Sequence, residues 1–67
     1  MTAKERRKAA GLSQAALAAK ASVGITTIYL VEKGYKPIYP GVRRALAQAL
    51  DTTEHELFPP GAVADAY

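Results

Sequence analysis

The stretch from Gly11 to Gly34 constrains this chain most, because it holds two short helical patterns separated by only three residues. The first pattern predicts a helix over Gln14–Lys20, and the second predicts a helix over Ile25–Lys33. Between them, Ser22-Val23-Gly24 interrupts the apolar spacing with small residues that allow a tight turn. A turn this short is typical of two helices that cross at a steep angle.

The residue types around the turn favour that crossing. Ser13 is a natural N-cap for the first helix, and the small side chain of Ala18 lets another helix approach closely. The apolar anchors before and after the turn are Leu17, Val23, Ile28 and Val31. At 100° per residue, Ile28 and Val31 share the inward face of the second helix, with Thr27 at its edge.

The opposite face of the second helix is also largely apolar. It carries Thr26, Tyr29, Leu30 and Lys33, with Ile25 at its border. A helix that is apolar on both sides is either buried all round or presents one face to a partner. Full burial is not expected in a chain of 67 residues, so we expect this face to make an external contact.

The other segments also predict short helices. Thr2 and Glu5 have the spacing of a capping box, which begins a helix that runs to about Ala10. Pro40 suits the first turn of a helix that reaches about Leu50, with Arg44, Ala47 and Gln48 on its outward side. Thr53-Glu54-His55-Glu56 is a second capping box for a short helix through Phe58. No repeat and no strand pattern is present, so we predict an all-α, compact bundle of four to five short helices.

Size and composition limit the function classes. There are no cysteines, which excludes disulfides and thiolate metal sites, and one histidine, His55, cannot build a zinc site alone. No apolar run reaches the ~18 residues that a membrane-spanning helix needs. We expect a soluble, cytoplasmic protein without a membrane segment, a metal, a cofactor or a small-molecule ligand. A core this small is marginal by itself, which leaves compact helix packing, a dimer, or a ligand that stabilises by binding the folded state.

The charges are distributed unevenly along the chain. All nine basic residues lie in residues 1–44 with only two acids, whereas residues 45–67 hold four acids and no Lys or Arg. Such asymmetry suggests an anionic partner at the basic end, although small soluble domains are often lopsided in charge.

Several sequence patterns together point to a known family. L-S-Q-x-x-L-A-x-K covers Leu12–Lys20, and V-x-x-x-x-I-x-x-V-E-K-G covers Val23–Gly34. The match continues through Pro37, A-x-A-L at Ala47–Leu50 and T-x-x-E-L from Thr53. Over about residues 8–58 the chain resembles the Xre/Cro/phage-repressor family of helix-turn-helix DNA-binding domains. The resemblance implies a lambda-repressor-like domain over residues 1–58, with the helix-turn-helix at 13–33 and a short tail over 59–67.

The resemblance also implies which side chains face DNA. The base-facing positions match Gln14, Ile25, Thr26, Tyr29 and Leu30, and Gln14 also matches a glutamine that reaches phosphate. Lys33 and Lys36 match positions near the DNA backbone, and Tyr35, Tyr39 and Arg43 are further phosphate candidates. Arg43 flanks the apolar stripe of its helix and is favoured over Arg44. Weaker candidates for outer contacts are Arg6, Arg7, Lys8 and Lys20.

Two positions depart from the family pattern. Ser22 stands where the turn usually has a glycine, so the turn must accept a non-glycine residue. The helix positions Ile25, Thr26, Tyr29 and Leu30 lack the Arg or Gln side chains that pair with guanine or adenine. Contacts with thymine methyl groups, hydrogen bonding by Thr26 and groove shape predict modest specificity biased toward A·T-rich sites.

The predicted function is a sequence-specific, double-stranded DNA-binding transcriptional regulator, a Cro/Xre-like repressor. It would act as a homodimer on a palindromic operator with half-sites about 10 bp apart. The predicted dimer surface lies in the C-terminal part, at Leu57 and Phe58, with Val63 and Tyr67 as further candidates.

Two alternatives remain. One is a protein-interaction module, such as an antitoxin or adaptor, that uses the apolar face at Ile25, Tyr29 and Leu30. The other is a DNA-binding excision or partition accessory factor. Catalysis is not expected: Ser13, Asp51 and His55 are the residue types of a nucleophilic triad, but Ser13 is better explained as a cap and His55 as a solvated side chain.

Overall fold

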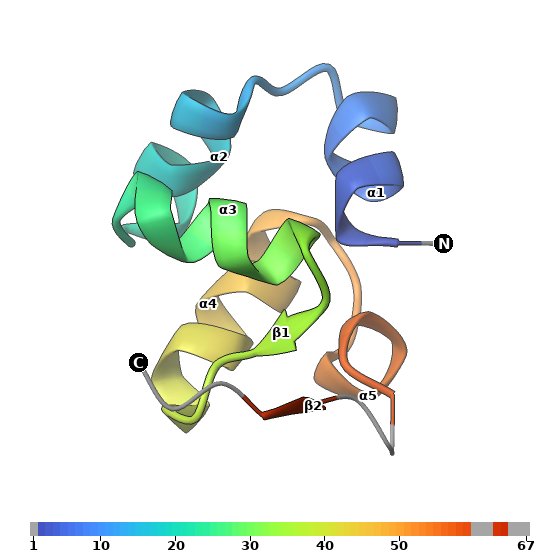
Figure 1. Ribbon diagram of the computed structural model, residues 1–67. Helices are drawn as coiled ribbons and strands as arrows, with labels where there is room; N and C mark the ends of the chain where they lie inside the picture. The colour runs from blue at the N-terminus through green and yellow to red at the C-terminus, as the bar shows by residue number, and fades with distance from the viewer. Residues whose placement is uncertain (1, 60–62, 65–67) are drawn as a thin grey trace.

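The computed structural model describes residues 2–59 and 63–64. Over these residues the chain forms five short helices and two very short strands (Figure 1). The helices are α1 (Ala3–Ala9), α2 (Gln14–Ala21), α3 (Ile25–Glu32), α4 (Pro40–Ala49) and α5 (Glu54–Leu57). The strands are β1 (Tyr35–Lys36) and β2 (Val63–Ala64). The predicted helical class is therefore confirmed.

The expectation that the chain has no strand was wrong. β1 and β2 pair in parallel, with Tyr35 opposite Val63 and Lys36 opposite Ala64. Two residues are too few to show the alternation by which a strand is recognised in a sequence. The pairing depends on where the chain returns after α5, which only the tertiary fold decides. The predicted boundary at residue 58 stays a prediction, because this pairing alone does not define the end of the domain.

Side-chain caps begin three of the helices. The capping box of α1 is complete: the Glu5 amide donates to Thr2 Oγ1 at 3.1 Å, and the Thr2 amide donates to Glu5 Oε1 at 2.7 Å. The hydrogen bond from the Thr2 backbone, followed by that with its side chain, holds the pKa of Glu5 below its ordinary value of 4.5. Ser13 caps α2, as expected, by accepting from the Ala16 amide at 3.0 Å.

The second predicted capping box is only half formed. Thr53 accepts from the Glu56 amide at 3.1 Å, but the Glu56 carboxylate turns to other partners. Its Oε2 accepts from the Thr52 hydroxyl at 3.1 Å and from the Arg6 guanidinium at 3.3 Å. A charged partner from α1 therefore replaces the backbone amide that the local pattern offers.

Residues with a positive φ follow four of the helices, and Gly34 after α3 is one of them, at φ +103°. Gly11 follows α1 at φ +73°, Ser22 follows α2 at φ +57° and Asp51 follows α4 at φ +54°. At the end of α2, the Val23 amide donates to the Ala18 carbonyl at 2.9 Å and the Ser22 amide donates to the Ala19 carbonyl at 3.2 Å. These paired bonds satisfy carbonyls that the helix end would leave unpaired. The turn therefore accepts Ser22 in a conformation that is easier for glycine.

The hydrophobic core lies between α2, α3, α4 and α5. Leu17, Ile28 and Leu46 are its most deeply buried side chains. Ala18 is buried as well, where α2 packs against both α3 and α4, in agreement with its predicted role at a helix crossing. Ala47, which was expected on the outward side of α4, is buried, so that expectation was wrong. Alanine is small enough to lie on either side, and the packing of α2 on α4 decides its place.

The C-terminal apolar residues have a different role from the one predicted. Leu57 and Phe58 are only 8% and 6% exposed, because they belong to the core of the single chain. They are therefore not available as the apolar contact of a dimer. The side chain of Val63 and the whole of Tyr67 lie outside the described residues.

Within the described residues, no single helix is long and apolar enough to cross a membrane. The pair α2 and α3 reaches that length and composition only when taken together, and the two helices are bent by 114° at their break.

Candidate nucleic-acid interface

α2 and α3 form a bent unit that turns one side of α3 outward. The chain reverses through Ser22 to Gly24, and the axes of the two helices differ in direction by 114°. Figure 1 shows α3 lying across the front of the molecule, with α2 behind one end and α1 near the other. The inward side of α3 is fixed by Ile28 and Val31, which are 1% and 8% exposed.

The outward side of α3 carries the residues predicted to face DNA bases. Thr26 is exposed, and Ile25 and Tyr29 are 38% and 44% exposed. Leu30 is half-buried. The structure therefore brings Ile25, Thr26, Tyr29 and Leu30 together on one helix. No side chain of α3 from Ile25 to Glu32 is basic or carries an amide.

Beneath this surface lies a buried ion pair that connects three helices. Arg7 of α1 donates from Nε to Glu32 Oε2 of α3 at 2.6 Å, and the two side chains are 9% and 6% exposed. Arg7 Nη1 also donates to the Leu12 carbonyl at 2.9 Å, in the connection from α1 to α2. Gln14, at the start of α2, donates from Nε2 to Glu32 Oε1 at 3.1 Å. The cluster fixes the end of α3 against α1 and α2.

Sequence reasoning missed this cluster and treated Arg7 as a candidate for an outer contact. A signal was nevertheless present. Glu32 lies four residues after the buried Ile28, which places it on the inward face of a helix. Glu32 is also the only acid between Glu5 and Asp51, so a buried charge at that position required a basic partner from another element.

The cluster changes what Gln14 can do. Gln14 is half-buried, and one of its amide hydrogens is committed to Glu32. With Tyr29, Lys33, Lys4 and Glu32 it lines a shallow hollow between α1, α2 and α3. Gln14 thus lies beside α3, and Glu32 engages one of its two amide hydrogens.

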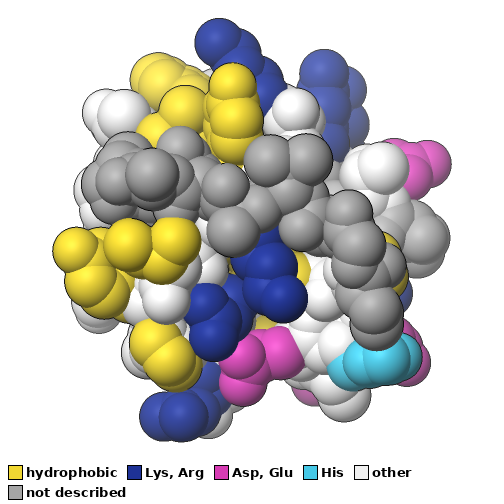
Figure 2. Space-filling model, turned by 60° about the horizontal axis from the view of Figure 1, so that its bottom comes forward, with side chains coloured by type: hydrophobic (Ala, Val, Ile, Leu, Met, Phe, Trp, Pro, Cys, Tyr) yellow, Lys and Arg dark blue, Asp and Glu magenta, His cyan; other side chains and the backbone are white. Residues whose placement is uncertain are grey.

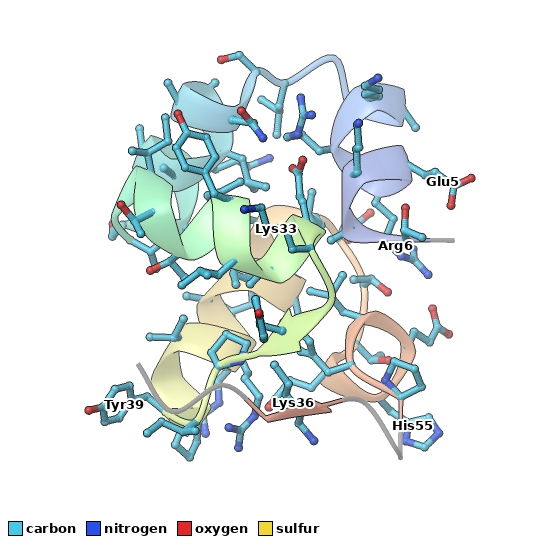
Figure 3. All side chains as sticks on the ribbon, in the orientation of Figure 1. Glu5, Arg6, Lys33, Lys36, Tyr39 and His55 are labelled. Carbon is cyan, nitrogen blue, oxygen red and sulfur yellow. The ribbon has the colours of Figure 1, made fainter. Side chains whose placement is uncertain are left out.

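The five predicted phosphate contacts are spread along the chain from the end of α3 through β1 to α4. In Figure 3, Lys33 projects from α3, whereas Lys36 and Tyr39 lie at the lower edge of the view. Lys36 is half-buried in β1 and lines a second hollow with Arg43 and residues of α5. Tyr35 is 38% exposed, and Tyr39, at the start of α4, is 58% exposed.

Arg43 is held by the protein. Its Nη1 donates to the Pro37 carbonyl at 2.6 Å, and its Nε lies 3.5 Å from Glu54 Oε1 of α5. Figure 2 shows the lower face of the molecule, where Lys and Arg side chains lie beside acidic ones and hydrophobic side chains lie along one flank. Arg43 thus joins the β1–α4 connection to α5, a role that its place beside the apolar stripe did not reveal.

The other basic residues divide into two groups. Arg6 pairs with Glu56 at 3.3 Å and Arg7 with Glu32, so both are engaged inside the protein. Lys4, Lys8, Lys20, Lys33 and Arg44 are exposed.

Among the described residues, no group of three or more His, Asp or Glu side chains is placed to hold a metal ion.

The bent pair, the exposed side of α3 and the helices that brace it are the parts of a helix-turn-helix. A family model described as "Helix-turn-helix domain" matches residues 1–58. The chain belongs to this family. The helix-turn-helix domains of this family bind DNA and are typically not enzymes. The match is consistent with the resemblance to Xre-type domains, and neither the curated proteins nor the solved structures gave a significant match.

Proposed function

We propose that this helix-turn-helix domain is a sequence-specific transcriptional regulator that places α3 in the major groove of double-stranded DNA. The observation that carries the proposal is the outward side of α3, which stays exposed while Ile28 and Val31 on the opposite side pack into the core. The major groove is wide enough to admit one α-helix. Binding to chromosomal DNA would place the protein in the cytoplasm.

The electrostatics near α3 favour an anionic partner. Lys33 follows the last turn of α3, and Lys4 shares the hollow that Gln14 and Tyr29 line. The acid of this region, Glu32, is neutralised by Arg7 in the buried pair and adds little negative potential at the surface. We propose Lys33, Tyr35, Lys36 and Tyr39 as phosphate contacts, together with Arg43 if DNA replaces its present partners.

We further propose that two copies act together as a repressor on a palindromic operator. One helix reads only a few base pairs, so two related copies spaced about 10 bp apart supply the length of site that a regulator needs. The contact between the copies would use exposed residues of the C-terminal part, since Leu57 and Phe58 are buried in each chain.

The test begins with selection of binding sites from a pool of random duplexes at fixed salt, followed by titration of the selected duplex at several salt concentrations. We expect affinity to fall steeply as salt rises, because lysines displace counterions from phosphates. Lys33→Ala should reduce the slope of log affinity against log salt by about 0.9, the value for one phosphate contact. A palindrome among the selected sites would support the dimer.

Thr26→Glu tests the docking face directly. A carboxylate at this exposed position of α3 would face phosphates in the groove, so duplex binding should be lost. Gln48→Glu is the matched control, because it adds the same charge at an exposed position of α4. Duplex binding that is absent at low salt, or that does not respond to salt, would contradict the proposal and favour the protein-interaction alternative.

A further inference from the structure

The outward side of α3 offers DNA mainly hydrocarbon. Ile25 and Tyr29 are well exposed, Leu30 contributes at the edge, and Thr26 adds one hydroxyl and one methyl group. Distinguishing bases by hydrogen bonds relies mainly on paired contacts, in which Arg and Lys donate and Asn and Gln both donate and accept. From Ile25 to Glu32 the helix has none of these four residue types.

The side chains next to α3 that could supply such pairs are engaged within the protein. Gln14 donates to Glu32, and Arg7 donates to Glu32 and to the Leu12 carbonyl. Arg43 donates to the Pro37 carbonyl and pairs with Glu54. Among the other candidates in the described residues, Arg44 and Gln48 are exposed but belong to α4, whereas the exposed Lys4 and Lys33 flank the outward side of α3 with donors only. The buried cluster therefore engages Arg7 and one amide hydrogen of Gln14, which leaves few hydrogen-bonding groups beside the apolar side chains of α3.

The feature of the major groove that matches a hydrocarbon surface is the C5-methyl group of a pyrimidine. Thymine carries this methyl group in the major groove. 5-Methylcytosine carries the same group at the same ring position, whereas cytosine and uracil lack it. An apolar contact that removes one methyl group from water contributes about a fourfold gain in affinity.

We propose that α3 recognises C5-methyl groups of pyrimidines, and that this surface therefore accepts 5-methylcytosine as well as thymine. The proposal rests on the DNA-binding function proposed above and names the chemical group that is read. The choice of DNA over an apolar protein surface follows from Lys4 and Lys33, which flank the apolar residues, while Glu32 is neutralised by Arg7.

Replacing thymine by uracil in the selected duplex tests this proposal. The exchange deletes the methyl group and leaves the hydrogen-bonding edges unchanged. We expect about a fourfold loss of affinity for each contacted methyl group, and thus more than tenfold where two are contacted. Replacing a cytosine at a contacted position by 5-methylcytosine should raise the affinity by a similar factor. Fluorescence anisotropy at fixed salt measures both changes.

A pair of protein variants assigns the effect to α3. Ile25→Ala shortens an exposed side chain of α3, so it should reduce the preference for thymine over uracil. Ile38→Ala is the matched control, because Ile38 is similarly exposed, at 43%, in the connection between β1 and α4. It should leave that preference unchanged.

The outcomes separate this inference from the proposed function. Equal affinity for the thymine and uracil duplexes, with strong salt-dependent binding to both, would overturn methyl recognition and leave DNA binding intact. An equal loss of discrimination in Ile25→Ala and Ile38→Ala would also overturn the assignment to α3. No binding to any duplex at low salt would overturn both proposals.

Discussion

At the scale of single residues, the buried pair of Arg7 and Glu32 has the largest structural consequences. Both side chains are almost excluded from water, and together they hold α1, the start of α2 and the end of α3. Taking two charges out of water is costly, and removing one partner leaves the other charge without compensation. The pair should therefore be far more sensitive to substitution than an ion pair at the surface.

Glu32→Gln should lower the free energy of unfolding by roughly 3–5 kcal/mol, because the Arg7 charge then stays buried without its partner. Urea denaturation followed by circular dichroism measures the change. Glu56→Gln makes the same substitution in the pair with Arg6, where the Glu56 side chain is 61% exposed, and should cost less than about 1 kcal/mol. Similar losses in the two variants would contradict the special role of the buried pair.

At the scale of elements, the turn between α2 and α3 determines how α3 is presented. Ser22 adopts φ +57° and ψ +42°, a left-handed conformation that is unfavourable for a residue with a Cβ atom. Its amide and that of Val23 close the end of α2. The tight turn is thus stabilised by backbone hydrogen bonds, while the backbone of Ser22 carries some strain.

Ser22→Gly should raise the free energy of unfolding by about 0.5–1 kcal/mol, because glycine adopts this conformation without steric cost. Gly11→Ala is the converse control. Gly11 has φ +73° and nothing lies within 4 Å of the place of an added Cβ, so only the backbone is strained. This variant should lose about 1 kcal/mol in the same thermal or urea unfolding experiment. If Ser22→Gly were destabilising, the serine side chain would have a role that its exposed position does not suggest.

At the scale of the whole molecule, Phe58 is the last described residue of the hydrophobic core. Leu57 and Phe58 from α5 pack with Leu46 and Leu50 of the α4 region, and the described part of the chain beyond them contributes only β2, paired with β1 over two residues. A two-residue pairing adds little stability compared with a buried aromatic ring. The boundary predicted at residue 58 can therefore be examined by shortening the chain.

Removal of residues 60–67 should change the free energy of unfolding by less than about 1 kcal/mol, because the described part of this segment contributes one short backbone pairing. Phe58→Ala, in contrast, should cost roughly 3–5 kcal/mol, because it leaves a cavity in the core. Denaturation curves of the two variants, with the oligomeric state measured by sedimentation, would compare them. A shortened chain as unstable as Phe58→Ala would move the boundary of the domain past residue 58.

The sequence by itself determined the helices and the bent α2–α3 unit. Caps at Thr2, Ser13 and Thr53 and the apolar spacing at Leu17, Ile28 and Val31 act over one or two turns, so local patterns were enough to predict them. The exposed side of α3 followed from the same periodicity, since the inward and outward faces of one helix are fixed by its own sequence.

Only the tertiary structure decided which polar side chains are engaged. Arg7 with Glu32, Gln14 with Glu32, and Arg43 with Glu54 join residues 25, 18 and 11 positions apart. The same is true of the β1–β2 pairing and of the burial of Ala47, Leu57 and Phe58. These contacts depend on how whole helices pack. The sequence alone does not show whether a charged or amide side chain is solvated or paired. In the folded chain the outward apolar side chains of α3 are exposed, whereas Arg7, Arg43 and one amide hydrogen of Gln14 are engaged within the protein.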